Sequence, residues 1–254
     1  MNSHPSLQSD IAIFAKTNFR NEQVPFGIKR SDRRGHLYLL GKTGTGKSTL
    51  MEALMVDDMR KGRGFALVDP HGDLVKKIKA RVPEDRIGDV IDFDITNPSQ
   101  PYGFNPLANV PEGKRALAAS GLLQVFKHLW TDSWGPRLEY ILRNCLLSLL
   151  QYPDATLSDI LRLLSDKYFR EKVLAFVENK QIREFWHKEY DHFPERFRIE
   201  AISPIQNKVG AFVSHAVINR ILTNPQKPLN LRRTMDDGKI LLVNLAKGKI
   251  GPQN

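Results

Sequence analysis

The chain has 254 residues, of which 41% are hydrophobic and 26% are charged, and its formal charge is +10 at pH 7. This composition excludes a disordered tail and is typical of a globular protein with a substantial hydrophobic core. The positive charge favours a polyanionic partner, nucleic acid or an acidic membrane face, but a basic surface in contact with solvent alone would carry the same charge.

The single cysteine and the hydropathy pattern exclude several further classes. Cys145 cannot form an internal disulfide and lies in an apolar run, which indicates a buried, unreactive thiol. The Cys and His residues do not have the spacing of a zinc site. The first ten residues are polar, and no stretch of about 18 apolar residues occurs. We therefore predict no signal peptide, no membrane-spanning helix and no structural metal.

The N-terminal part alternates between short apolar runs and helical patterns. Continuous apolar strands that alternate with helices predict a parallel α/β sheet covered on both faces. The expected elements are a turn or loop over 29–34, a strand over 36–40, a glycine-rich loop over 41–46, a helix over 47–61, a strand over 65–68, a short basic helix over 74–80 and a strand over 89–93.

The pattern changes after residue 110 to the spacing of helices. Apolar residues recur on single helical faces over 122–129, 138–149 and 157–164. Ser203 and Pro204 predict the N-cap and first position of a further helix. A strand pattern returns at 239–245, which we expect to join the sheet that contains 37–40. The predicted domains are 1–110 (the N-terminal segment and the first part of the α/β core), 111–225 (an all-helical insertion) and 226–254 (an incomplete return to the core).

A complete phosphate-binding motif follows the first predicted core strand. Its residues are Gly41, Lys42, Thr43, Gly44, Thr45, Gly46, Lys47 and Ser48, with Thr49 next in the chain. They match G-x-x-x-x-G-K-[ST] between a strand and a helix, which is the context the motif requires. Glycines let several N–H groups face one phosphate, and a helix N-terminus adds partial positive charge. The motif predicts bound ATP with Mg²⁺, with Lys47 as a catalytic residue at the β- and γ-phosphates and Ser48 as a metal ligand.

Asp69 is a second candidate catalytic residue. It ends the apolar run at 65–68, which is the form of a strand that supplies a magnesium-binding carboxylate, but Pro70 follows where a catalytic Glu often lies. Asp69 is therefore expected to line the site from the end of a neighbouring strand. The alternative interpretation is that 69–73 forms a turn, in which Asp73 caps the next helix.

Other charged residues leave two interpretations open. Arg137 is a candidate for an arginine that acts on a neighbouring subunit's nucleotide, or a surface residue beside Trp134. Two basic groups could contact DNA phosphates without reading sequence, or could form solvated faces. The first group is Lys76, Lys77, Lys79 and Arg81, and the second is Arg232 and Arg233.

Several segments resemble one class of P-loop ATPases. The segment 36–50 is similar to the phosphate-loop region of the HerA/FtsK class, and 69–74 resembles that class's second strand and turn. The segments 202–210 and 238–248 resemble TraG-type conjugative coupling proteins, the DNA-pumping ATPases of type IV secretion systems. The resemblance covers about residues 26–251.

This resemblance implies a RecA-like core with an all-helical insertion. It also implies sequence-independent DNA binding, a homohexameric ring in the full-length protein, a contact with a membrane secretion apparatus, and a location in the cytoplasm or at the cytoplasmic face of the inner membrane. In the family, the strand with the catalytic Asp-Glu pair follows the segment matched by 239–245. Because the chain stops at Asn254, we expect an incomplete core.

Three hypotheses follow. The first is the ATP-binding core of a DNA translocase of the coupling-protein type, or of a HerA-like DNA-processing type. The second is a fragment that binds nucleotide without turnover. The third, a P-loop kinase for a small molecule, is disfavoured because the helical block is rich in leucine and lacks a lid with clustered arginines.

Overall fold

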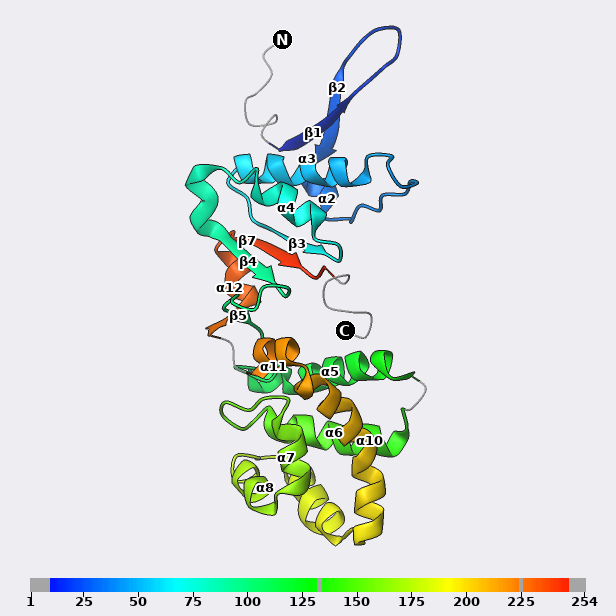
Figure 1. Ribbon diagram of the computed structural model, residues 1–254, viewed down its shortest axis with the longest axis vertical. Coiled ribbons are helices and arrows are strands. Elements are labelled where there is room, and N and C mark those ends of the chain that lie inside the picture. The colour runs from blue at the N-terminus through cyan, green and yellow to red at the C-terminus, as the bar shows by residue number, and fades with distance from the viewer. Residues whose placement is uncertain (1–9, 132–133, 224–225, 247–254) are drawn as a thin grey trace. The chain divides into compact units, whose positions relative to one another are not determined.

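The computed structural model describes residues 10–131, 134–223 and 226–246 (Figure 1). The fold is mixed α/β, with helix predominating and a small, mostly parallel sheet. The chain divides into two compact units. The first, called the α/β unit, combines Met1–Gln100 with Asn230–Asn254, and the second, called the helical unit, is Pro101–Leu229.

A three-stranded parallel sheet forms the centre of the α/β unit. Its strands are β3 (Phe65–Asp69), β7 (Ile240–Asn244) and β4 (Val90–Asp94), in the order β3-β7-β4. Strand β7 pairs with both neighbours over its whole length. The predicted strands at 65–68, 89–93 and 239–245 are thus confirmed, with ends that differ by one residue at most.

Helices α3 (Lys47–Arg60) and α4 (Asp73–Lys79) accompany this sheet, and both are confirmed predictions. Their apolar residues form one core with the sheet because they bury the same face of each strand. The core consists of Met55, Met59, Leu67, Val75, Ile78, Ile240 and Leu242. On the other face Val68 is 60% exposed. The prediction that both faces of the sheet are covered is therefore wrong at this strand. The α/β unit also contains the 3-10 helix η1 (Glu84–Asp89) and helix α12 (Leu231–Asp236).

An antiparallel hairpin precedes the sheet. It consists of β1 (Ile11–Lys16) and β2 (Pro25–Lys29), followed by the short helix α2 (Arg30–Arg33). The strands approach so closely that a Cβ at Gly27 would collide with the carbonyl of Ala12. The predicted turn or loop at 29–34 is therefore wrong for most of its length, because it contains a strand end and a helical turn.

The predicted strand at 36–40 is also wrong. These residues form no strand, and Tyr38 and Leu40 are 82% and 81% exposed. An apolar run becomes a strand only where a neighbouring strand offers backbone partners. The two neighbours of β7 in its sheet are β3 and β4. The prediction that 239–245 shares a sheet with 37–40 is therefore wrong as well.

The second unit is built from helices around α6 (Pro136–Leu149), whose inward residues Ile141, Cys145, Leu146 and Leu149 are fully buried. The predicted helical faces over 122–129, 138–149 and 157–164 all lie largely in helices. The other elements are β5 (Tyr102–Gly103), η2 (Glu112–Lys114), α5 (Arg115–Leu129), α7 (Asp159–Ser165), α8 (Lys167–Leu174), α9 (Lys180–Glu184), the π-helix η4 (Phe185–Glu189), η5 (Tyr190–His192), α10 (Glu195–Ser214), α11 (Ala216–Thr223) and β6 (Lys227–Pro228).

Two local predictions in this unit have opposite outcomes. Pro204 does not begin a helix but lies inside α10, where the Ser203 hydroxyl donates a hydrogen bond to the carbonyl of Ile199 at 2.8 Å. A proline at that position removes one backbone hydrogen bond, and the flanking turns still continue the helix. Cys145 is buried as predicted, and burial raises the pKa of its thiol.

Candidate nucleotide-binding site

The phosphate loop adopts a backbone that glycine makes possible. Gly44 and Gly46 have φ of +84° and +93°, the left-handed region that other residues rarely adopt. A Cβ at Gly41 would collide with the hydroxyl of Thr45. Helix α3 begins directly after Gly46, and no side chain caps its first turn. The loop therefore ends at an uncapped helix N-terminus, the usual backbone arrangement of an anion site.

Lys47 lies folded over this loop. Its Nζ donates hydrogen bonds to the carbonyls of Gly41 at 2.7 Å and Lys42 at 2.8 Å. The Thr45 hydroxyl donates to the same Lys42 carbonyl at 2.8 Å. The ammonium group thus lies where both ends of the loop meet, held by neutral carbonyls and without a carboxylate partner among the described residues. A phosphate oxygen would be a stronger acceptor for it than either carbonyl.

The remaining predicted residues of the loop are accessible. Thr43, Ser48 and Thr49 are exposed. Within the described chain the Ser48 hydroxyl has no hydrogen-bond partner, so it is available as an oxygen ligand for a hard cation such as Mg²⁺. The residues present therefore fit a magnesium-bound phosphate group.

Asp69 is the last residue of β3 and is only 7% exposed. Its side chain accepts hydrogen bonds from the turn before α4. Its Oδ1 accepts a hydrogen bond from the N–H of His71 at 2.9 Å. Its Oδ2 accepts from the N–H groups of Leu74 at 2.8 Å and Val75 at 3.2 Å. Burial raises the pKa of Asp69, but these backbone hydrogen bonds outweigh it and hold the pKa below its usual value. The carboxylate is charged and fully engaged in structure.

The N-cap of α4 is not Asp73, the residue that the alternative interpretation of the sequence proposed. Asp73 is the first residue of the helix and is exposed, whereas Gly72 occupies the N-cap position. Gly72 has φ of +83°, and a Cβ there would collide with Oδ1 of Asn244 at the end of β7. Asp69, from outside the helix, supplies the acceptor instead.

The sequence analysis missed a row of polar residues that ends all three strands. Asp69 and Asp94 both pair in register with Asn244. The Asn244 amide donates to Oδ2 of Asp94 at 3.0 Å, and Thr96 donates to Oδ1 through its N–H and its hydroxyl. Burial raises the pKa of Asp94, and the hydrogen bonds from Thr96 and Asn244 more than reverse it, so that the net pKa is lowered. The available signal was that each apolar strand ends on Asp or Asn.

The phosphate loop and this polar row belong to the same end of the sheet. Only residues 61–64 separate the end of α3 from the start of β3, so α3 runs antiparallel to the strand and begins toward its carboxyl end. In Figure 1 the first turn of α3 and the arrowhead of β7 accordingly lie on the same side. Ligands of open α/β sheets bind at the carboxyl ends of strands.

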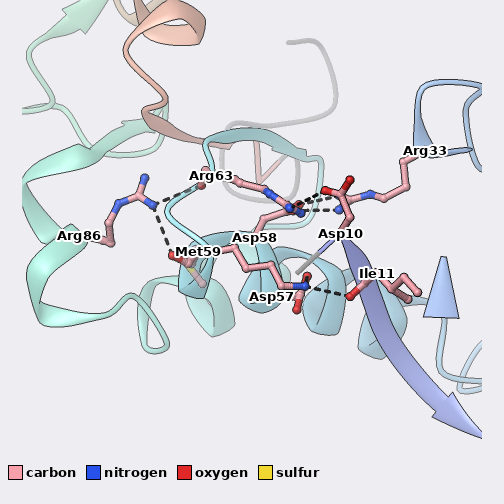
Figure 2. Close-up of polar contacts among 9 residues, drawn as sticks. Asp10, Ile11, Arg33, Asp57, Asp58, Met59, Arg63 and Arg86 are labelled. Atoms are coloured by element: carbon pink, nitrogen blue, oxygen red, sulfur yellow. Dashed lines mark hydrogen bonds and ion pairs between the residues drawn. The ribbon is translucent and has the colours of Figure 1, made fainter. Parts of the chain in front are cut away.

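An arginine network holds the opposite end of α3 (Figure 2). Arg33 binds Asp58 through two hydrogen bonds of 2.9 and 2.6 Å, which raise the pKa of the guanidinium. Arg63 pairs with Asp58 at 3.7 Å and with Asp10 at 3.4 Å. Arg86 donates to the carbonyl of Met59 at 3.4 Å. This network joins the hairpin, α2 and the start of β3 to α3, and so fixes the helix that carries the phosphate loop.

Most of the other predicted candidates have local partners. Arg137 stacks on the ring of Phe197 at 4.3 Å, a packing role. In the two basic groups, four side chains pair with carboxylates and two, Lys76 and Lys77, are exposed with no ion pair to a described residue. The pairs are Lys79–Asp92, Arg81–Glu52, Arg232–Asp236 and Arg233–Asp237.

One cluster in the helical unit has the composition of a metal site. Glu171, His187 and Asp191 bring ligand atoms within 4.8 Å of one another. Asp191 already pairs with Arg170 at 2.7 Å and lies 3.8 Å from Lys167. Two cations beside Asp191, one of the two acidic ligands, oppose the binding of a dication.

Comparison with known proteins gives no family. No protein-family model matches the chain, and no curated protein matches it. Among the described residues, no helix combines the length and the hydropathy needed to cross a bilayer.

Proposed function

We propose that this chain binds a magnesium-bound nucleoside triphosphate, ATP, at residues 41–49. The observation that carries the proposal is the closed loop, in which Lys47 reaches two carbonyls of a glycine-rich turn that ends at an uncapped helix. Lys47 would exchange these carbonyls for the β- and γ-phosphates, and Ser48 would ligate the metal. Bound ATP supplies the phosphoanhydride bond whose hydrolysis releases energy.

The larger role that we propose is the ATP-binding core of a DNA translocase of the coupling-protein type. The support is the resemblance of 36–50, 202–210 and 238–248 to that class, together with the charge of +10. In this proposal the α/β unit is part of a RecA-like core, the helical unit is its insertion, and ATP hydrolysis drives sequence-independent DNA transfer by a homohexamer at a secretion apparatus. A HerA-like DNA-processing translocase is the alternative within the same class.

A second candidate function is nucleotide binding without turnover. Hydrolysis needs a carboxylate that orients water. Asp69, the acidic residue nearest in sequence with the right strand context, directs its oxygens to three backbone N–H groups. This observation favours binding with slow hydrolysis.

The test compares two lysines of one loop. The dissociation constant of a fluorescent ATP analogue with Mg²⁺ is measured for the wild type, Lys47→Ala and Lys42→Ala. Lys47→Ala removes a charged donor and should weaken binding roughly 10- to 100-fold, since a hydrogen bond to a charged group contributes about 1.5–3 kcal/mol. Lys42 contributes its backbone carbonyl to the loop and its side chain is exposed, so Lys42→Ala should change affinity less than about threefold, the effect of a charge that solvent screens. Equal effects of the two variants, or no binding by the wild type, would refute the phosphate-loop assignment.

Steady-state phosphate release then separates the two functions. Translocase activity predicts ATP hydrolysis that DNA stimulates and Lys47→Ala abolishes. Binding without turnover predicts that Mg²⁺ and ATP bind while phosphate release stays at the level of Lys47→Ala.

A further inference from the structure

The α/β unit contains a cavity whose lining does not include the phosphate loop. Its volume is about 660 Å³. The lining residues come from the start of α2, from the starts of β3 and β7, from α12, and from the glycine turns before both strands. A volume between about 300 and 1,000 Å³ is typical of sites for small molecules.

Glycines shape the wall of this cavity. Gly62 and Gly238 have φ of +69° and +61°, and a Cβ at Gly64 would lie 2.6 Å from the carbonyl oxygen of Gly238. The close approach of the two turns therefore requires glycine at position 64, and the left-handed backbone favours glycine at positions 62 and 238. All three glycines line the cavity.

The floor of the cavity is apolar. Phe65, Ala66 and Leu241 come from the sheet, and Leu231 and Met235 from α12. Leu231 and Met235 remain 44% and 71% exposed, so a ligand in the cavity would remove apolar surface from water. That burial is favourable and requires a ligand with an apolar body.

All charged side chains that line the cavity are cations. Lys239 pairs with Asp89 at 2.7 Å, and Arg63 pairs with Asp58 and Asp10. Arg30 is exposed and forms no ion pair with any residue that the structure describes. A smaller hollow of about 250 Å³ shares Arg30 and Arg63 and adds two further arginines, Arg33 and Arg34, against one acid, Asp58. The lining of the two hollows thus carries an excess of positive charge.

We infer that this cavity binds a small amphipathic anion. An aliphatic or aromatic body would lie on the apolar floor, and a phosphate, sulfonate or carboxylate group would accept hydrogen bonds from the Arg30 guanidinium. Because the lining lies at the start of β3, and the phosphate loop belongs to the carboxyl ends of the strands, the site is separate from the proposed nucleotide site. It stands whether or not the chain hydrolyses ATP.

The experiment uses 8-anilinonaphthalene-1-sulfonate, an aromatic anion whose fluorescence rises on binding, with the full chain. The wild type should show a saturable component that Arg30→Gln weakens about tenfold, the low end for a charged hydrogen bond at an exposed site. The matched control is Arg232→Gln, which removes the same charge from α12, outside the cavity, and should change affinity less than twofold. Uncharged 1-anilinonaphthalene should bind wild type and Arg30→Gln equally.

A second variant tests the apolar floor. Ala66→Trp fills the cavity from an exposed position and should abolish the same component, while far-UV circular dichroism shows that the variant is folded. The saturable binding of the probe should be unchanged in Lys47→Ala, and unchanged in the wild type with excess Mg²⁺ and ATP. The inference is overturned if Arg30→Gln and Arg232→Gln have equal effects, if Ala66→Trp binds like the wild type, or if ATP displaces the probe. Failure of ATP to bind anywhere would refute the proposed function and leave this inference intact.

Discussion

Replacing Asp69 by asparagine should reveal whether its carboxylate serves structure or magnesium. We predict that Asp69→Asn lowers the free energy of unfolding of the α/β unit by about 2–4 kcal/mol. The carboxylate lies at the end of β3 and accepts three hydrogen bonds from the turn and first residues of α4. Asparagine has nearly the same size, so the change tests charge and hydrogen bonding without a cavity.

The magnitude follows from the geometry of the two oxygens. If the asparagine oxygen keeps the bond to the N–H of His71, its NH₂ group faces the N–H groups of Leu74 and Val75, which lose their acceptor. A hydrogen bond to a charged group contributes about 1.5–3 kcal/mol, and a buried donor without an acceptor costs about 1–3 kcal/mol. Two donors lose their acceptor, which gives a range of about 2–6 kcal/mol. Because the bond from Val75 is long at 3.2 Å, whereas that from Leu74 is 2.8 Å, we expect the lower part of this range, about 2–4 kcal/mol.

The matched control is Asp73→Asn, four residues along the same segment. Asp73 is exposed in the first turn of α4 and interacts chiefly with the helix dipole, which contributes about 0.3–1 kcal/mol. Urea unfolding followed by far-UV circular dichroism measures both variants. Hydrogen exchange of the amides of Leu74 and Val75 localises the effect, since the tryptophans of the chain all lie in 101–229 and report on the helical unit.

Two results would refute this reasoning. One is a loss of stability for Asp69→Asn no greater than for Asp73→Asn, with unchanged exchange at Leu74 and Val75. The other is an unchanged stability together with loss of ATP hydrolysis, which would make Asp69 a magnesium ligand and not a structural acceptor.

Three further predictions concern pH, a buried ion pair and DNA. The pKa values of Asp69 and Asp94 are lowered in the folded state, so their contribution to the free energy of unfolding is complete above the unfolded pKa of about 3.9 and disappears as pH falls through the lower folded values. Urea unfolding between pH 7 and 2.5 should show this loss of stability, and the loss should be less steep in Asp69→Asn. Arg170→Met should destabilise the helical unit by about 3 kcal/mol, because Arg170 is 3% exposed and its removal leaves Asp191, among the described residues, with the more distant Lys167 as its remaining ion-pair partner. Tryptophan fluorescence in urea measures this loss, and a value below about 1 kcal/mol would contradict the prediction. DNA binding measured by anisotropy should weaken steeply with salt. If both lysines contact phosphates, the double variant Lys76→Gln, Lys77→Gln should reduce the slope of log K against log salt by up to about 1.8, and salt-independent binding would argue against a DNA role.

The features that sequence predicts well are local ones. Helix α3 has apolar residues at helical spacing between a glycine-rich loop and Gly62, and β7 is a continuous apolar run, so each follows from its own residues. The phosphate loop is equally local, since its left-handed glycines and its lysine lie within eight residues. Such features need no knowledge of which distant segment lies beside them.

The features that sequence misses depend on partners far along the chain. The segment 36–40 is as apolar as a strand, but its composition does not say whether a neighbouring strand will accept it. Asp94 and Asn244 are 150 residues apart, and only the register of β4 on β7 brings them together. Pro204 carries a helix-start signal, but packing along α10 outweighs one missing hydrogen bond.

The polar row at the strand ends bears directly on whether the chain alone hydrolyses ATP. A catalytic carboxylate must be charged and must direct an oxygen to water or to the metal. Asp69 and Asp94 are charged, since their pKa values are lowered, but the hydrogen bonds that lower them also occupy their oxygens. The contacts that keep these acids ionised therefore make them poor candidates for the water-orienting group. In the proposed nucleotide site, a complete phosphate loop with carboxylates that are engaged in structure should bind ATP and turn it over slowly.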